Sequence, residues 1–143
     1  MLTPVIEHRK IVVAMVVLFL VLTSSFGFCQ GNNSKLFKQL QKEAKEINAT
    51  LPQMISKEIQ MIRVIARSYN EIALVCKTLF YQVSDLDITT MESALKPQTQ
   101  RSLCSDPDVL EMMKRGISYT YVYFDKNDKY IGEFTVTPGD CGF

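Results

Sequence analysis

Residues 117–137 read ISYTYVYFDKNDKYIGEFTVT, and this stretch decides the fold. Residues 117–124 and 130–137 are rich in β-branched and aromatic side chains, which favour extended strands. The polar residues 125–129 between them are typical of a turn. The stretch therefore predicts a β-hairpin near the C-terminus.

The turn length also predicts which side chains of this hairpin share a face. Side chains alternate along a strand, so cross-strand partners and every second residue point the same way. The predicted pairs on one face are Tyr119 with Val136, Tyr121 with Phe134 and Tyr123 with Gly132. Ser118, Thr120, Glu133 and Thr135 point to the other face. We expect the aromatic face to be the buried one.

A short helix is predicted immediately before this hairpin. Asp106 is a good N-cap, and Pro107 suits the first helical position. Lys114 and Arg115 lie where a helix dipole favours positive charge, and Gly116 can end the helix.

An earlier hairpin is predicted within residues 59–80, where apolar and β-branched residues flank a polar turn at residues 68–71. A helix over residues 54–67 is an alternative, because apolar residues there also recur at helical spacing. Two further helices are predicted. One runs from a cap at Ser34 to about Asn48, and the other begins at residues 85–87 and is either kinked or restarted at Pro97.

These elements predict an α+β domain, in the order α-β-β-α-α-β-β. Its core would be a four-stranded, mostly antiparallel sheet with helices packed on one face. At 143 residues the chain has room for one such domain.

The N-terminus carries an export signal. Residues 11–22 read IVVAMVVLFLVL, and the basic residues Arg9 and Lys10 precede them. This layout predicts a signal peptide, residues 1–29, cleaved near Gly27 or Cys29. The alternative is an uncleaved signal anchor in which residues 11–29 form a transmembrane helix. Lipidation of Cys29 is disfavoured, because bulky Phe28 precedes it.

We accordingly divide the chain into the signal or anchor at residues 1–29, a linker and amphipathic helix at 30–50, and the α+β domain at 51–143. The domain is expected in the periplasm or outside the cell. If the anchor is retained, the protein is a single-pass inner-membrane protein with this domain outside the cytoplasm.

Charge and histidine content exclude several functional classes. Removal of residues 1–29 leaves 14 basic and 14 acidic side chains, so the phosphate neutralisation that drives nucleic-acid binding is not available. The only histidine, His8, lies in the export signal. A catalytic site that depends on histidine cannot be built in the mature domain.

Three pairs of carboxylates are candidates for metal binding or acid–base catalysis: Asp85 with Asp87, Asp106 with Asp108, and Asp125 with Asp128. Helix capping explains the first two pairs better, and turn formation explains the third. The sequence therefore predicts no catalytic residue, no cofactor and no metal site.

The cysteines predict one disulfide. Cys104 precedes the short helix and Cys141 follows the last strand by a few residues. The helix is about 13.5 Å long, and four extended residues can run back along it, so a Cys104–Cys141 bond is geometrically natural. An oxidising compartment permits it. Cys76 is expected to be a small buried strand residue.

A pattern across residues 51–143 resembles small exported, periplasmic proteins of Gram-negative bacteria. It comprises Leu51-Pro52, a hairpin, Cys104 with Asp106-Pro107, Gly116 before tyrosine-rich strands, and Val136-Thr137 leading to Cys141. The resemblance implies location and architecture, and brings no activity. Asn32 and Asn48 would be glycosylation sequons in a eukaryotic secretory protein, so such an origin stays open.

The functional hypothesis is a non-enzymatic binding or accessory protein of the bacterial cell envelope, with another envelope protein as its partner. The first alternative is a membrane-anchored subunit of an envelope assembly. The second is a small envelope hydrolase that works without histidine, through carboxylate, lysine or tyrosine side chains.

Overall fold

The computed structural model describes residues 27–143 of the chain. Most of the predicted signal or anchor segment lies outside these described residues. The chain forms two compact units, Met1–Leu36 and Phe37–Phe143, and the second unit contains the whole sheet. No described helix is long and apolar enough to cross a membrane.

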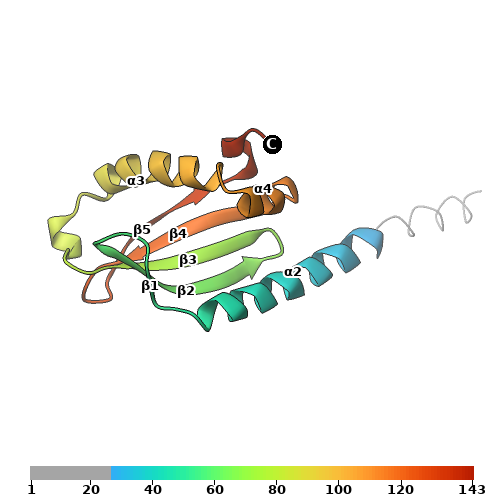
Figure 1. Cartoon of the computed structure of the whole chain (residues 1–143), viewed down its shortest axis with the longest axis horizontal. Coiled ribbons are helices and arrows are strands. Elements are labelled where there is room, and N and C mark those ends of the chain that lie inside the picture. The colour runs from blue at the N-terminus through green and yellow to red at the C-terminus, as the bar shows by residue number, and fades with distance from the viewer. Residues whose placement is uncertain (1–26) are drawn as a thin grey trace, which may run out of the picture. The chain divides into compact units, whose positions relative to one another are not determined.

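The domain is α+β, as predicted, with its helices and strands in the order α-β-β-β-α-α-β-β (Figure 1). The helices are α2 (Gly27–Asn48), α3 (Ile88–Leu103) and α4 (Pro107–Lys114), with 3₁₀ turns η1 (Val83–Asp85) and η2 (Pro138–Cys141). The strands are β1 (Gln53–Met54), β2 (Ile59–Ser68), β3 (Glu71–Thr78), β4 (Ser118–Phe124) and β5 (Tyr130–Val136).

The sheet has five strands in the order β1-β2-β3-β4-β5, where the sequence predicted four. The extra strand, β1, is two residues long and pairs with the start of β2. The β3–β4 pair is parallel and the other three pairs are antiparallel. The connection between β3 and β4 contains α3 and α4, as a crossover between parallel strands requires.

Both predicted hairpins are present. Tyr119 pairs with Val136, Tyr121 with Phe134 and Tyr123 with Gly132, which is the predicted register. Residues 59–68 form β2, so the alternative helix over residues 54–67 is wrong. The reason is that the apolar side chains of β2 are shared between the two faces of a sheet.

Helix α2 begins earlier than the sequence predicted. It starts at Gly27, so Ser34 lies inside the helix and residues 30–33, expected as a linker, are helical. Within the second unit, Leu40 and Ala44 are its buried side chains.

The helices between the hairpins follow their capping signals. The Asp87 side chain accepts a hydrogen bond from the Thr89 N–H at the start of α3. Pro97 lies inside α3, which continues through it as one helix. Asp106 caps α4 through the N–H groups of Asp108 and Val109, and Gly116 follows the helix with φ of +87°.

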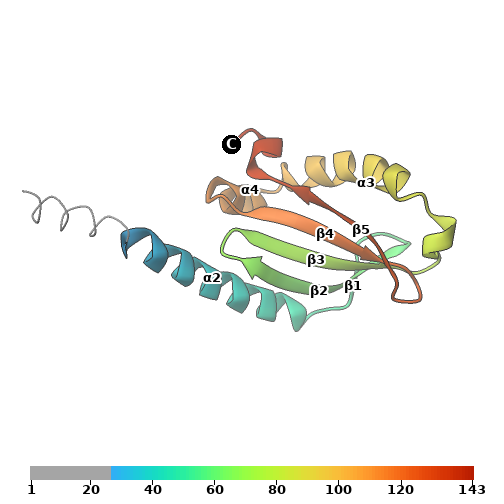
Figure 2. The same ribbon diagram turned by 180° about the vertical axis from the view of Figure 1, so that it is seen from behind.

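The helices cover one face of the sheet. The core cluster combines Cys76, Tyr123, Phe134 and Val136 of this face with Leu103 of α3 and Met113 of α4. The aromatic face of the last hairpin is therefore buried, as predicted. Seen from behind, strands β2 to β5 are not covered by α3 or α4 (Figure 2).

Candidate functional site

The face of the sheet opposite α3 and α4 is the first candidate binding surface, and we call it the open face. The strand registers and the alternation of side chains define its members. They are Arg63, Ile65 and Arg67 on β2, Glu71, Ala73, Val75 and Lys77 on β3, Ser118, Thr120, Val122 and Phe124 on β4, and Tyr130, Glu133 and Thr135 on β5.

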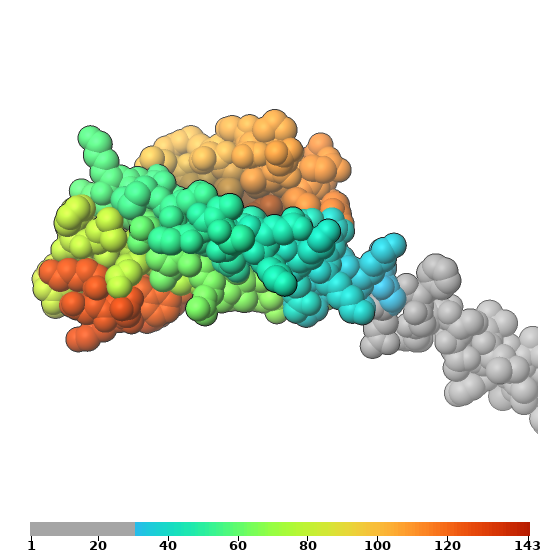
Figure 3. Space-filling model, turned by 60° about the horizontal axis from the view of Figure 1, so that its bottom comes forward, coloured from blue at the N-terminus to red at the C-terminus, as the bar shows by residue number. Residues whose placement is uncertain are grey.

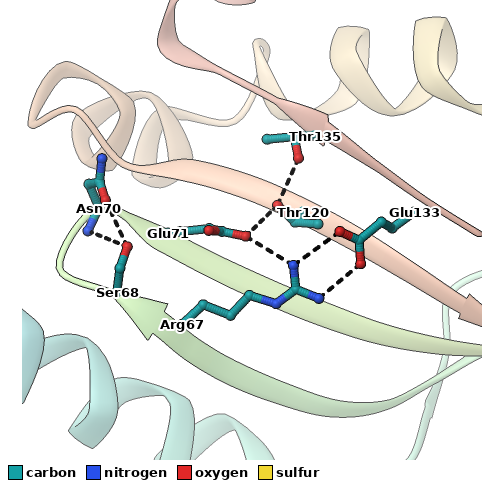
Figure 4. A network of polar contacts seen from close by, with 7 residues as sticks. All are labelled: Arg67, Ser68, Asn70, Glu71, Thr120, Glu133 and Thr135. Carbon is teal, nitrogen blue, oxygen red and sulfur yellow. Dashed lines mark hydrogen bonds and ion pairs between the residues drawn. The ribbon is translucent and has the colours of Figure 1, made fainter.

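A polar network occupies one half of the open face (Figure 4). Arg67 reaches across the sheet and donates to both carboxylate oxygens of Glu133, with N···O distances of 2.9 and 3.3 Å. Its Nη1 also donates to Glu71 at 3.2 Å. Thr135 donates to Thr120, which donates to Glu71 at 2.8 Å. The network thereby joins β2, β3, β4 and β5.

This network is built for structure and not for proton transfer. The hydrogen bond from Arg67 holds the pKa of Glu133 below its usual range, and the bond to Glu133 raises the pKa of Arg67. Both groups stay charged at neutral pH, so neither can exchange a proton there. The network also shelters Thr120, which is only 1% exposed although no described helix packs over it.

Exposed apolar side chains on the open face lie apart from one another, at the outer strands β2 and β5. Ile65 and Tyr130 are 39% and 53% exposed, and the Tyr130 ring packs edge-on against Phe124 with centroids 5.9 Å apart. Lys77, beside Phe124 on the open face, forms an ion pair with Asp128. Exposed apolar side chains interspersed with charged ones also occur at protein–protein interfaces.

A groove lies between the second half of α2 and β2, at the edge of the open face. Figure 3 shows this part of α2 lying along the neighbouring surface of the domain. Its volume is about 360 Å³. The residues that line it are Gln41, Ala44, Lys45 and Asn48 of α2 and Arg63, Val64, Ile65 and Ala66 of β2.

Asn48 closes part of the β2 edge. Its Nδ2 donates to the Val64 carbonyl, and its Oδ1 accepts from the Val64 N–H, both at 2.8 Å. The side chain thus replaces one residue of a neighbouring strand. Its carboxamide is fully engaged, which sets it apart from the free side chain that a glycosylation site presents.

The carboxylate pairs singled out from the sequence have structural roles. Asp87 and Asp106 cap helices, Asp85 accepts the N–H of Gln82, and Asp128 pairs with Lys77. Within residues 27–143, no group of three potential metal-ligating side chains comes together. The two grooves on the described surface, one between α2 and β2 and one along α3, do not supply the two converging carboxylates of a hydrolase. The α2–β2 groove has none, and the groove along α3 has only Glu92.

Asp125 does more than the turn role that its sequence position predicts. It is fully buried, and it accepts hydrogen bonds from the N–H groups of Val83, Asn127 and Lys129 at 2.7–3.0 Å. Burial by itself would raise the pKa of Asp125, but these hydrogen bonds outweigh burial and lower it. The carboxylate fastens η1 to the β4–β5 turn.

The three tyrosines of β4 and the Cys76 thiol are poor nucleophiles. Burial raises the pKa of Tyr119, Tyr121 and Cys76 to about 12, and it raises that of Tyr123 as well. Cys76 is the buried strand residue that the sequence predicted. All four groups stay protonated at neutral pH, when a thiol reacts slowly.

The structure joins Cys104 to Cys141, with their Cα atoms 5.4 Å apart. Gln100 of α3 adds a second attachment for the tail, since its Nε2 donates to the Asp140 carbonyl at 2.7 Å. The bond lies at the helix-covered side, away from the open face.

Sequence reasoning missed Arg63, Arg67, Glu133 and Asn48 as members of candidate sites. Arg67 and Glu133 are 66 residues apart, so no local pattern connects them. In the sequence, Asn48 is marked only by its place at the end of a predicted helix, and many surface residues without a binding role occupy such places.

Several solved structures share this fold. A protein from Pseudomonas aeruginosa that is described as secreted has a TM-score of 0.62 and 22% identity, over 76% of this chain and 95% of its own. The pilotin EpsS of the Vibrio vulnificus type 2 secretion system has a TM-score of 0.64 and 17% identity, over 80% and 98%. The pilotin AspS of the Vibrio cholerae type II secretion system has a TM-score of 0.63 and 17% identity, over 80% and 100%.

No protein-family model and no curated protein sequence matches the chain. At identities of 17–22%, the likeness to the solved structures establishes the fold. That fold occurs in a secreted protein and in two components of secretion systems of Gram-negative bacteria, in agreement with the resemblance seen in the sequence.

Proposed function

We propose that this chain is a non-enzymatic accessory protein of the bacterial cell envelope that binds another envelope protein and serves a type II secretion system as a pilotin. The observation that carries the proposal is the fold match over nearly the full length of two pilotins. The match spans 80% of this chain and 98–100% of each pilotin.

The chemistry of the described residues supports a binding role. Among the candidate carboxylates, Asp87 and Asp106 cap helices, and Asp125 accepts three backbone N–H groups. Burial raises the pKa of the buried tyrosines of β4 and of Cys76. The open face, with exposed Ile65 and Tyr130 among charged side chains, and the α2–β2 groove are surfaces that a partner protein could contact. An oxidising compartment outside the cytoplasm fits the Cys104–Cys141 bond.

The test is deletion of the gene in its source bacterium, followed by assay of enzymes that the type II system exports. We expect their activity in the medium to fall and their activity in the periplasm to rise, with recovery when the gene is restored on a plasmid. A strain that lacks a core component of the same system is the positive control. If that control fails to secrete while the deletion strain secretes normally, the proposal is wrong.

The location is tested separately by intact-mass measurement of the protein purified from membranes and from periplasm. We expect a periplasmic form that lacks the first 27–29 residues. A full-length form in the inner membrane would instead establish the anchored alternative, in which residues 11–29 span the bilayer.

A further inference from the structure

We propose that the groove between α2 and β2 binds a segment of the partner that carries carboxylates beside small apolar side chains. The identity of the partner as an envelope protein rests on the proposed function. The choice of surface and the chemistry of the segment rest on the groove itself.

The floor of the groove is apolar. Ala44, Val64 and Ala66 line it with small side chains, and Ile65 extends it onto the open face, where it is 39% exposed. A groove of about 360 Å³ lies within the range of pockets that hold ligands, roughly 300–1,000 Å³. Small floor residues let a partner's apolar side chains approach the backbone closely.

The charge at the groove selects an acidic partner. Arg63 and Lys45 both line it, and neither forms an ion pair with any residue of the described part of the chain. No carboxylate lines the groove. The other charges of the open face, Arg67, Lys77 and their carboxylates, are already paired. Two free cations beside an apolar floor favour a segment with negative charge.

The strand edge offers main-chain hydrogen bonds as well. In an antiparallel pair, alternate residues turn their N–H and C=O groups away from the partner strand. Asn48 binds both outward groups of Val64, so the same groups of Ala66 point to this edge too. Among the described residues none other than those of the sheet bonds to them, and an extended partner segment could do so.

A second copy of this chain fits the groove poorly. A two-fold symmetric contact centred on the groove would place the two grooves against each other. Arg63 and Lys45 would then face the same cations, and like charges repel.

The test begins with photo-crosslinking of the full-length protein in its own cells. p-Benzoylphenylalanine replaces Gln41, which lines the groove, or Lys42, which is paired with Glu46 on the helix surface and serves as the matched control. Mass spectrometry then maps the crosslinked peptide. We expect the Gln41 position alone to capture one segment of a type II secretion component, with at least one carboxylate next to apolar residues.

The mapped segment is then made as a fluorescent peptide and titrated with the full chain. We expect Arg63→Glu and Lys45→Glu each to weaken binding about tenfold, and both together about a hundredfold. Arg101→Glu is the control, because Arg101 is exposed on α3 and outside the groove. A peptide in which the carboxylate is replaced by lysine should bind the Lys45→Glu variant better than the original protein.

Three results would overturn the groove assignment: equal crosslinking from Gln41 and Lys42, a mapped segment without carboxylates, or equal affinity of all variants with thermal midpoints unchanged. Each leaves the gene-deletion test of the proposed function intact. Conversely, a charge-dependent segment from a protein outside any secretion system would support the groove and count against the pilotin role.

Discussion

Arg67 and Glu133 form a two-point ion pair at 2.9 and 3.3 Å although β3 and β4 lie between the strands that carry them. The pair ties the two outer long strands together over the small side chains in the middle of the open face. Its geometry is the fork-to-fork arrangement that arginine makes and lysine cannot. The open face is thus held in shape by side chains where α3 and α4 hold the other face.

Loss of this pair should have a small, pH-dependent effect on stability. Both side chains are more than a third exposed, so solvent screens the pair. We expect Glu133→Gln to lower the free energy of unfolding by about 0.5–1 kcal/mol at pH 7, measured by urea titration. Glu46→Gln removes the more exposed Lys42–Glu46 pair and is the matched control, with no measurable effect expected.

The sign of the pH dependence follows from the lowered pKa of Glu133. A carboxyl group whose pKa is lower in the folded state stabilises the fold above its unfolded value of about 4.3, and the effect disappears as the pH falls through the folded value. The difference between the wild type and Glu133→Gln should therefore vanish at low pH. A difference that persists below the folded pKa would show that packing, and not charge, is lost.

Asn48 should contribute more to the stability of the domain than its exposed position indicates. Asn48→Ala leaves the N–H and C=O of Val64 without partners at the strand edge, and we expect a loss of about 1–3 kcal/mol in unfolding free energy. Asn48→Asp keeps the acceptor for the Val64 N–H and loses the donor to its carbonyl. Hydrogen exchange should show a faster Val64 amide in the alanine variant than in the aspartate variant. Equal exchange in both would refute this role.

Asp125 should make the domain sensitive to acid. Because its pKa is lowered in the folded state, its stabilising effect is present above the unfolded pKa of about 3.9 and is lost as the pH falls through the folded value. We expect Asp125→Asn and Asp125→Ala to lower the thermal midpoint at pH 7, with alanine the more damaging since it removes all three acceptor contacts. At acid pH the asparagine variant should approach the wild type. A midpoint gap that is the same at both pH values would contradict this account.

The elements that the sequence predicted correctly are those set by residues close together in the chain. The last hairpin and its register followed from residues 117–137 alone, and α4 followed from its caps, because both patterns are complete within about 20 residues. The crossover that makes β3 and β4 parallel neighbours was not predicted. Its pairing joins Glu71 to Ser118, and nothing local marks two distant strands as partners.

The candidate sites were less predictable than the fold for the same reason. Arg67 and Arg63 look alike in the sequence, yet one is paired across the sheet and the other lines a groove. Helix α2 was predicted too short because Gly31 and the two asparagines after it have low helix propensity. Strand β1 was missed because two residues carry no periodicity.

The C-terminal tail is attached at more points than the sequence indicated. Besides the Cys104–Cys141 bond, the Asp140 carboxylate accepts hydrogen bonds from the N–H and the hydroxyl group of Thr137. Gln100 donates a hydrogen bond to the Asp140 carbonyl, and the Lys114 ammonium lies over the Phe143 ring. A reduced tail therefore keeps its turn, but it loses the covalent link between α3 and the end of the last strand.

We expect Cys104→Ser with Cys141→Ser to lower stability more than any single polar substitution above. The bond closes a loop with a sequence separation of 37, for which chain entropy gives roughly 4 kcal/mol, and removal of native disulfides costs about 2–5 kcal/mol. In a domain of this size that lowers the thermal midpoint by about 10 °C or more. The single variant Gln100→Ala separates the contributions, since it removes the hydrogen bond to Asp140 and leaves the disulfide. Hydrogen exchange should become faster in η2 and α4 of the double variant and stay unchanged in β2 and β3. An unchanged midpoint would show that the noncovalent contacts alone hold the tail.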